Sequence, residues 1–448
     1  MTLIAAELQS NPLSVNVLQS PERRDFLVTC GKVAGLIALG GAGGAIEFGG
    51  EYALTHPGAA TLDLNLAISA VSPPEAPIIE NLEAPYPVRR VERSYNNLIT
   101  HFATRNGMFL DNNRDNTIGS NGEYATVWSF SAALRALGAA RAITGTLGEN
   151  ATTQYADSSA QIEQYWLDGP RGYDAGYLPG PRAYGDFSQR YLDDNGWVGN
   201  KHMLDNSIRP NKLAVGRAKE VATLGVSQWD TKYGGGMPWR QRINGDITSR
   251  VLVANMTMAQ LMVRLYTATG NKAYYHPDRS GQPDATMVTG WVDENLRASN
   301  GLYSDGKGID GSMDPHQWTY GIGTVIGTKS ALNKLDPQRY PFGEIVELAT
   351  KSLHAMKGSS ALLYPNIAYD DIQDNAFNAI YFSEIFDLID QHGLSEDNPL
   401  TVLALNKLQA CVDQLSDDPY SNLLQQAGAL QLAVMGALRL PESKYTAF

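Results

Sequence analysis

Hydrophobic residues recur every three or four positions along the chain from about residue 88 onward. This period places them on one side of an α-helix, and no stretch alternates apolar and polar residues as a half-buried strand would. The pattern therefore predicts an all-helical body. Twelve helices are expected, at residues 88–103, 123–145, 152–167, 191–207, 212–228, 247–269, 284–298, 317–335, 342–357, 374–391, 399–417 and 421–438.

The twelve predicted helices fall into two classes that alternate along the chain. The odd-numbered ones are amphipathic and charged, as in residues 344–348, which suits a helix with one wet face. The even-numbered ones combine Gly, Ala, Ser and Thr with large apolar residues on every side, as in residues 320–328 and 426–438, which suits closely packed, buried helices. Alternating outer and inner helices predict six helical hairpins closed into an (α/α)6 barrel.

In such a barrel the inner helices run parallel, so their N-termini gather at one end of the ring. The partial positive charges of those helix ends then point into it. Polar residues stand at several of these starts, at residues 121–123, 191–194, 317–320 and 369–371. We therefore expect the chemistry of the protein at that end.

The N-terminal part of the chain has a different pattern. Arg23-Arg24 precedes the apolar, glycine-rich stretch 33–46, in the order of a twin-arginine export signal. The stretch is too short for a dependable membrane span, which needs about 20 apolar residues. We expect a signal segment over residues 1–60 and an exported protein that is periplasmic, secreted or held in the cell envelope. Five prolines then predict a linker over residues 61–87.

Residues 88–448 are expected to form one catalytic domain. The formal net charge is −12 and the chain has no Lys/Arg-rich run, which removes the electrostatic basis for binding nucleic acid or anionic membranes. Of the two cysteines, Cys30 lies in the signal segment, so Cys411 is left without a disulfide partner. We expect a globular monomer with no nucleic-acid partner and no stable membrane span.

Asp193-Asp194 is the first candidate for catalysis, because two adjacent carboxylates at a helix start can act on one sugar ring. Like charges this close do not ionise together easily, so one pKa should rise and supply an acid while its neighbour stays charged. The helix N-terminus opposes this by favouring both charges. The alternative is an Asp cap followed by an acidic first turn.

Other motifs give weaker signals. Asp370-Asp371-Ile372-Gln373-Asp374 has the spacing with which helical isoprenoid synthases hold magnesium, but no second metal-binding run accompanies it. Residues 111–123 depart from a calcium loop at two positions, and the seven His show no paired spacing. We therefore expect no metal and no cofactor.

Gly234-Gly235-Gly236 with Trp239 suits a sugar face beside an indole, or a plain flexible loop.

In combination, these motifs resemble glycoside hydrolase family 76, the endo-α-1,6-mannanases and related enzymes, over most of residues 90–390. Tyr191-Leu192-Asp193-Asp194-Asn195-Gly196-Trp197 is similar to the family's Tyr-x-Asp-Asp-Asn-x-Trp, and the Gly234-Gly235-Gly236 loop to its Gly-Gly-Gly-x-x-Trp. Further similar segments follow in order, at residues 253–259, 265–274, 301–306, 319–324 and 377–385.

The resemblance implies an (α/α)6 enzyme that hydrolyses α-mannosidic bonds with retention, with α-1,6-mannan as the expected substrate. It places Asp193 as nucleophile and Asp194 as general acid/base, a mechanism that needs carboxyl groups about 5–5.5 Å apart. The expected substrate-binding residues are Tyr191, Trp197, Gly235, Gly236, Trp239, Asn255 and Tyr320.

The sequence departs from the family at two places. Tyr320-Gly321-Ile322-Gly323 stands where members usually have Tyr-Asn-Gln-Gly, and Asn378 stands where a Lys is usual. The departures bear on the substrate more than on the reaction. Two alternatives stay open: a glycan-binding envelope protein without catalysis, and another toroid enzyme such as a lyase, an unsaturated glucuronyl hydrolase or an isoprenoid synthase.

Overall fold

A computed structural model describes residues 86–113, 124–169, 174–184, 189–241, 248–276, 282–365 and 374–440. Twelve α-helices make up most of this part of the chain. Across the described segments, no helix combines the length and apolarity that a membrane crossing requires. The predicted signal segment and linker lie outside the described residues, except that Tyr86 and Pro87 open the first helix.

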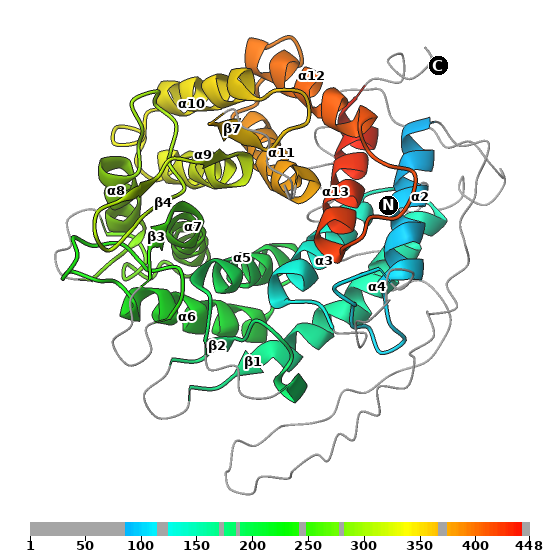
Figure 1. Cartoon of the computed structure of the whole chain (residues 1–448), viewed down its shortest axis with the longest axis horizontal. Coiled ribbons are helices and arrows are strands. Elements are labelled where there is room, and N and C mark those ends of the chain that lie inside the picture. The colour runs from blue at the N-terminus through cyan, green and yellow to red at the C-terminus, as the bar shows by residue number, and fades with distance from the viewer. Residues whose placement is uncertain are drawn as a thin grey trace, which may run out of the picture.

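The helices form two concentric rings (Figure 1). The inner ring comprises α3 (Val127–Ala140), α5 (Leu192–Ile208), α7 (Leu252–Thr269), α9 (Thr319–Asn333), α11 (Asp374–Gln391) and α13 (Leu423–Arg439). The outer ring comprises α2 (Tyr86–His101), α4 (Thr146–Gln161), α6 (Lys212–Ser227), α8 (Ala285–Asn295), α10 (Phe342–Ala355) and α12 (Pro399–Asp413). Each inner helix packs on the next, and α13 packs on α3 to close the ring. The predicted (α/α)6 barrel is confirmed.

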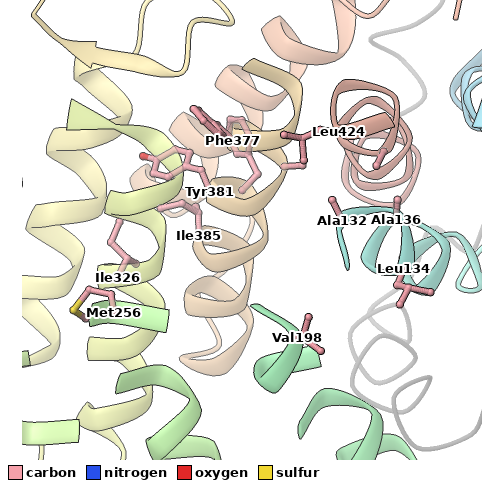
Figure 2. Close-up of a cluster of buried hydrophobic side chains, with 14 of the residues drawn as sticks. Ala132, Leu134, Ala136, Val198, Met256, Ile326, Phe377, Tyr381, Ile385 and Leu424 are labelled. Carbon is pink, nitrogen blue, oxygen red and sulfur yellow. The ribbon is translucent and has the colours of Figure 1, made fainter. Parts of the chain in front are cut away.

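Burial explains why the two helix classes could be told apart. The inner helix α7 is buried on nearly every side for most of its length, whereas the outer helix α2 buries one stripe and exposes Arg89 and Arg93. Figure 2 shows the resulting core, which draws apolar side chains from all six inner helices. They include Ala132, Val198, Met256, Ile326, Phe377 and Leu424.

Seven short strands among the described residues correct the expectation of a body without strands. β1 (Trp166–Leu167) pairs with β2 (Gly176–Tyr177), and β3 (Arg250–Val251), β4 (Gly306–Lys307) and β5 (Met313–Asp314) form one antiparallel sheet. β6 (Gln317–Trp318) pairs with β7 (Leu362–Tyr364). Strands of two or three residues are too short to show alternation, so the pattern of the sequence gave no sign of them.

The third predicted helix, 152–167, is displaced along the chain. α4 begins earlier, at Thr146, and ends at Gln161, where a 3₁₀ helix, η2 (Ile162–Tyr165), leads into β1. A second 3₁₀ turn, η3 (Arg182–Tyr184), follows β2.

Five inner helices, α3, α5, α7, α9 and α11, begin at the same end of the ring, which we call the mouth. Side chains from their first turns meet there: the Phe377 ring of α11 stacks on Tyr320 of α9 at 4.1 Å and on Trp128 of α3 at 6.1 Å between centroids. Beside these rings, Trp197 of α5, Val253 of α7 and Ile380 of α11 form a small hydrophobic cluster, which we call the floor. The predicted gathering of N-termini is therefore confirmed for these five helices.

Candidate active site

The start of α5 holds Asp193 and Asp194 at the mouth. Asn195, which is fully buried, fixes this start: its side-chain amide donates to the carbonyls of Tyr191 (2.8 Å) and Tyr177 (2.9 Å), and its Oδ1 accepts from the Tyr177 N–H (2.7 Å). Gly196 allows α5 to approach α7, since a Cβ there would lie 2.2 Å from Thr257 Oγ1. The residues that follow the aspartate pair therefore anchor it.

The two carboxylates are half-buried and differ in their surroundings. Asp193 Oδ2 accepts a hydrogen bond from Trp239 Nε1 at 3.0 Å. Burial raises the pKa of Asp193 to about 6, and the Trp239 bond acts in the opposite direction. Burial, and then the charge of Asp193, raise the pKa of Asp194 well above its usual range. Burial and the charge of Asp193 therefore favour the proton on Asp194, and the Trp239 hydrogen bond favours the charge on Asp193.

A third acidic residue, Asp305, lies close enough to interact with this pair. Burial, then Asp314, and also Asp193 raise its pKa to about 7. Its carbonyl accepts from the Leu252 N–H at 2.6 Å, so the β3–β4–β5 sheet holds it beside the start of α7. Sequence reasoning gave Asp305 no role. The only signal was its place in a family-like segment between an outer and an inner helix.

Trp239 and Tyr320 are two predicted sugar-contact residues that lie at the mouth. Trp239 is 42 % exposed, and its ring lies 4.9 Å from that of Tyr191. Its carbonyl accepts from the Leu192 N–H at 2.8 Å, which ties the loop to the start of α5. Burial and the nearby acidic residues raise the pKa of Tyr320 well above its usual value, so it remains a neutral hydroxyl.

The structure places Trp197 within the floor, where 4 % of its surface is exposed. The Arg135 guanidinium lies 4.9 Å from its ring centre. A ring packed in this way offers no open face for a sugar. We therefore assign Trp197 a packing role in place of the predicted substrate contact.

Asn255, Gly235 and Gly236 are also buried, and they support the loop that carries Trp239. The Asn255 amide pairs with both backbone groups of Met237, at 2.8 and 3.0 Å. Gly236 has a φ of 85°, and a Cβ there would lie 2.6 Å from the Trp291 ring. They position the loop that carries Trp239, and their sugar contact stays a prediction.

Both departures from the family lie in the interior. Ile322 has no exposed surface, and Gly321 is buried against Leu252. Asn378 accepts from Thr319 Oγ1 at 2.9 Å and donates to the Ser359 carbonyl at 2.6 Å, so it fixes the start of α9. The altered residues therefore shape the packing around the mouth.

The rival metal motifs lie mostly outside the described residues. Of the segment 370–374, only Asp374 is described, and its carboxylate accepts from the Ala361 N–H at 2.5 Å. Residues 114–123 of the possible calcium loop are likewise outside. Within the described segments, no group of three or more His, Cys, Asp or Glu is arranged to hold a metal ion. Burial raises the pKa of the Cys411 thiol to about 12, so it is unreactive.

The model of the family described as Glycosyl hydrolase family 76 matches residues 94–387 of this chain. No curated protein sequence matches this chain. Among solved structures, the GH76 α-mannanase of Bacteroides thetaiotaomicron is similar, with 16% identity and a TM-score of 0.62 over 79% of this chain and 95% of that chain.

Two further structures show the same likeness. An inactive α-1,6-mannanase variant of Salegentibacter sp. HEL1_6, with two neighbouring aspartates changed to asparagine and α-1,6-mannotriose bound, is 16% identical with a TM-score of 0.60, over 78% of this chain and 98% of that chain. Dfg5 from Chaetomium thermophilum, in complex with glucosamine, is 14% identical with a TM-score of 0.51, over 70% and 78%. At these identities the likenesses show the fold.

Proposed function

This chain belongs to glycosyl hydrolase family 76, and from that premise we propose that it hydrolyses α-mannosidic bonds, those of α-1,6-mannan first, with retention of configuration. The observation that carries the proposal is the unequal aspartate pair at the start of α5. Asp193 accepts the Trp239 hydrogen bond, whereas burial and the neighbouring charge favour the protonated form of Asp194. One residue is thereby suited to attack and the other to donate a proton.

The reaction has two steps. In the first, an Asp193 oxygen bonds to the anomeric carbon, the glycosidic C–O bond breaks, and Asp194 gives its proton to the leaving oxygen. In the second, the Asp194 carboxylate takes a proton from water, the water oxygen bonds to the anomeric carbon, and the Asp193 ester bond breaks. Two inversions return the starting configuration, and both aspartates recover their initial protonation.

The charges at the mouth favour a neutral glycan. Asp305 adds an acidic group beside the pair and Asp314 adds another beside Asp305, so an anionic substrate such as a diphosphate would be repelled. Trp239 offers a sugar platform next to the nucleophile, and Tyr320 offers a hydroxyl. The choice of α-1,6-mannan is supported by the α-1,6-mannotriose bound to the similar Salegentibacter variant.

The test is release of reducing ends from α-1,6-mannan and a panel of other α-linked glycans by the wild type, Asp193→Asn and Asp194→Asn. We expect cleavage of α-1,6-mannan by the wild type and loss of cleavage in both variants, each folded by circular dichroism. Binding of a glycan by the wild type without cleavage of any panel member would support the non-catalytic alternative. Full activity of both variants would point to a different toroid chemistry.

We also propose that the protein acts outside the cytoplasm. The support is the order of Arg23-Arg24 and the apolar stretch 33–46 in the sequence. Changing both arginines to lysine should leave the protein in the cytoplasm of the expressing cell, as measured by fractionation. Unchanged export of that variant would contradict a twin-arginine route.

A further inference from the structure

A cavity of about 730 Å³ lies on the outer wall of the ring, away from the mouth. Outer helix α4 forms one side, the start of α6 forms the other, and the second half of α5 lies at the base. Its volume is within the range of small-molecule sites. Arg209, which follows the last residue of α5, is about 20 Å along the helix axis from Asp194. We call this cavity the α4/α6 pocket.

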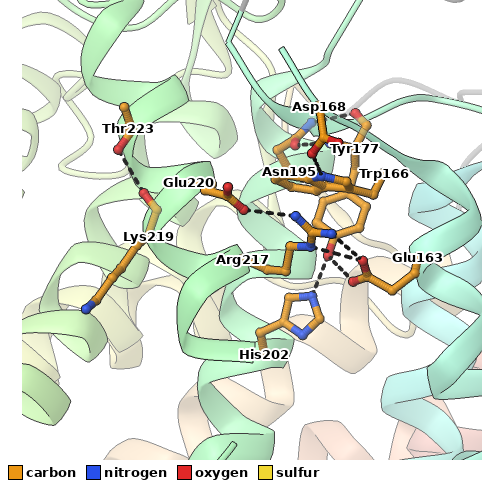
Figure 3. Close-up of polar contacts among 10 residues, drawn as sticks. All are labelled: Glu163, Trp166, Asp168, Tyr177, Asn195, His202, Arg217, Lys219, Glu220 and Thr223. Carbon is orange, nitrogen blue, oxygen red and sulfur yellow. Dashed lines mark hydrogen bonds and ion pairs between the residues drawn. The ribbon is translucent and has the colours of Figure 1, made fainter. Parts of the chain in front are cut away.

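The two acidic residues that line the α4/α6 pocket are already matched by cations. Glu163 pairs with Arg217 at 2.8 Å, and Arg217 lies 3.9 Å from the Trp166 ring centre (Figure 3). Asp205 pairs with Lys201 at 2.9 Å, and Lys201 is only 4 % exposed.

The base of the pocket is similarly satisfied. The Tyr155 hydroxyl bonds to Asp205, and Lys201 bonds to Ser159. His202 contacts the Tyr177 hydroxyl at 2.6 Å, and burial lowers its pKa to about 3, so it is neutral. The base therefore brings no net charge of its own.

Three further cations line the pocket: Arg141, Arg209 and Lys212. None of the three forms an ion pair within the described part of the chain, and the Arg141 guanidinium lies over the Tyr155 ring at 4.9 Å. α6 adds the positive end of a 16-residue helix, with Lys212 as its first residue and no acidic residue in its first turn. A concave surface with this charge is notable on a chain whose net charge is −12.

We propose that the α4/α6 pocket is a second, non-catalytic binding site for an oxyanion, the phosphate or carboxylate group of a saccharide-sized ligand. Arg209 and Lys212 contact the anion together with the Lys212 and Leu213 N–H groups of α6, since the Ala214 N–H bonds to the Asn211 side chain, and Arg141 borders it from the α3 side. Such a site would hold an anionic glycan or sugar on the enzyme at a distance from the neutral glycan being cleaved. The proposal does not depend on hydrolysis at the mouth.

The test is isothermal titration calorimetry of the full chain at constant ionic strength with four probes: inorganic phosphate, mannose 6-phosphate, glucuronate and mannose. We expect saturable binding of phosphate or glucuronate, and about tenfold weaker binding by Arg209→Gln/Lys212→Gln. Lys219→Gln/Lys357→Gln removes the same charge at exposed sites outside the pocket and should bind like the wild type.

The probes separate the ligand chemistries. Mannose 6-phosphate binding more tightly than phosphate would show that the sugar contributes, and glucuronate binding alone would make the group a carboxylate. Mannose binding that is unaffected by Arg209→Gln/Lys212→Gln belongs to the mouth. The proposal is overturned if no anionic probe saturates by about 10 mM, or if both double variants bind anions equally. Release of reducing ends by the folded variants distinguishes this outcome from failure of the hydrolytic proposal.

Discussion

The mouth and the α4/α6 pocket are reached by the same helix, α5, and their charges are arranged in opposite ways. At the mouth, Asp193 and Asp194 stand side by side on α5 with Asp305 nearby, and burial raises all three pKa values. In the pocket, each acidic group has a cation, as in the Lys201 to Asp205 pair at 2.9 Å. At the mouth, buried carboxylates stand without cationic partners among the described residues, which costs stability and is typical of a reactive site. In the pocket, every described carboxylate is paired and three cations are left over, which suits the binding of an anion.

The largest expected effect is at the mouth. Asp193→Asn removes the nucleophile and Asp194→Asn removes the proton donor, so each should lower kcat on α-1,6-mannan about 1,000-fold or more. Asp157→Asn, an exposed change on α4, is the matched control and should retain activity. Steady-state kinetics gives the comparison, and near-normal activity in either mouth variant would remove the distinction between the two ends.

Asn255→Ala tests whether the loop under Trp239 is held from below. The change removes both bonds to Met237 and leaves buried backbone groups unpaired, which should cost about 2–3 kcal/mol of unfolding free energy. Urea unfolding measures this, and activity should fall as Trp239 loses its support. An unchanged midpoint and slope would show that the loop is held by other contacts.

Trp239→Phe keeps an aromatic ring and removes the donor to Asp193. Without that bond the ionised form of Asp193 is less stable, so its pKa should rise above about 6. The acid limb of the pH profile of kcat/KM should then move up by about half a unit, with activity reduced about tenfold. Tyr364→Phe, at an exposed position, should leave that limb in place. If the acid limb does not move in Trp239→Phe, the Trp239 hydrogen bond does not affect the pKa of Asp193.

The cost of the mouth to stability should appear in the pH dependence of unfolding. The pKa of Asp193 is about 6 in the folded protein against an ordinary 3.8, so the folded state binds the proton more tightly. Stability should fall as pH rises through this window. Asp193→Asn should raise the Tm by about 2 °C at pH 7 and by less at pH 4. A gain that is equal at both pH values would contradict the assignment.

The smallest expected effect is at the other end of α5. Arg209→Gln/Lys212→Gln should change kcat on neutral α-1,6-mannan less than about twofold, because about 20 Å of helix separates Arg209 from Asp194. Kinetics at two salt concentrations checks this. A large loss in the folded variant would mean that the pocket and the mouth act as one site.

The ring of helices could be predicted because inner and outer helices differ in their local amino-acid composition. Helices buried on every side, such as α9, carry small residues and no charge-rich face, and their alternation with amphipathic helices leaves few other folds. The aspartate pair could be predicted from two adjacent positions. Contacts between distant segments could not be predicted. Asp305 lies at the mouth because Gly306 pairs with Val251, and no local sequence pattern indicates that pairing.

The exposure of individual side chains at the mouth could not be predicted from the sequence motifs either. Trp197 and Trp239 are both tryptophans in family-like motifs, yet one is 4 % exposed and the other 42 %. The difference depends on Arg135 and Val253, which come from other helices. A motif identifies a residue as important without distinguishing a contact to ligand from a contact that holds the site together.

The central claim is that Asp193 attacks and Asp194 donates the proton, so that two inversions occur in each turnover. Proton NMR of α-1,6-mannan during the first minutes of cleavage by the wild type measures the anomer released before mutarotation. The account predicts that the α-anomer appears first and the β-anomer grows later. Initial release of the β-anomer would show a single inversion and would contradict the assignment of Asp193 as nucleophile.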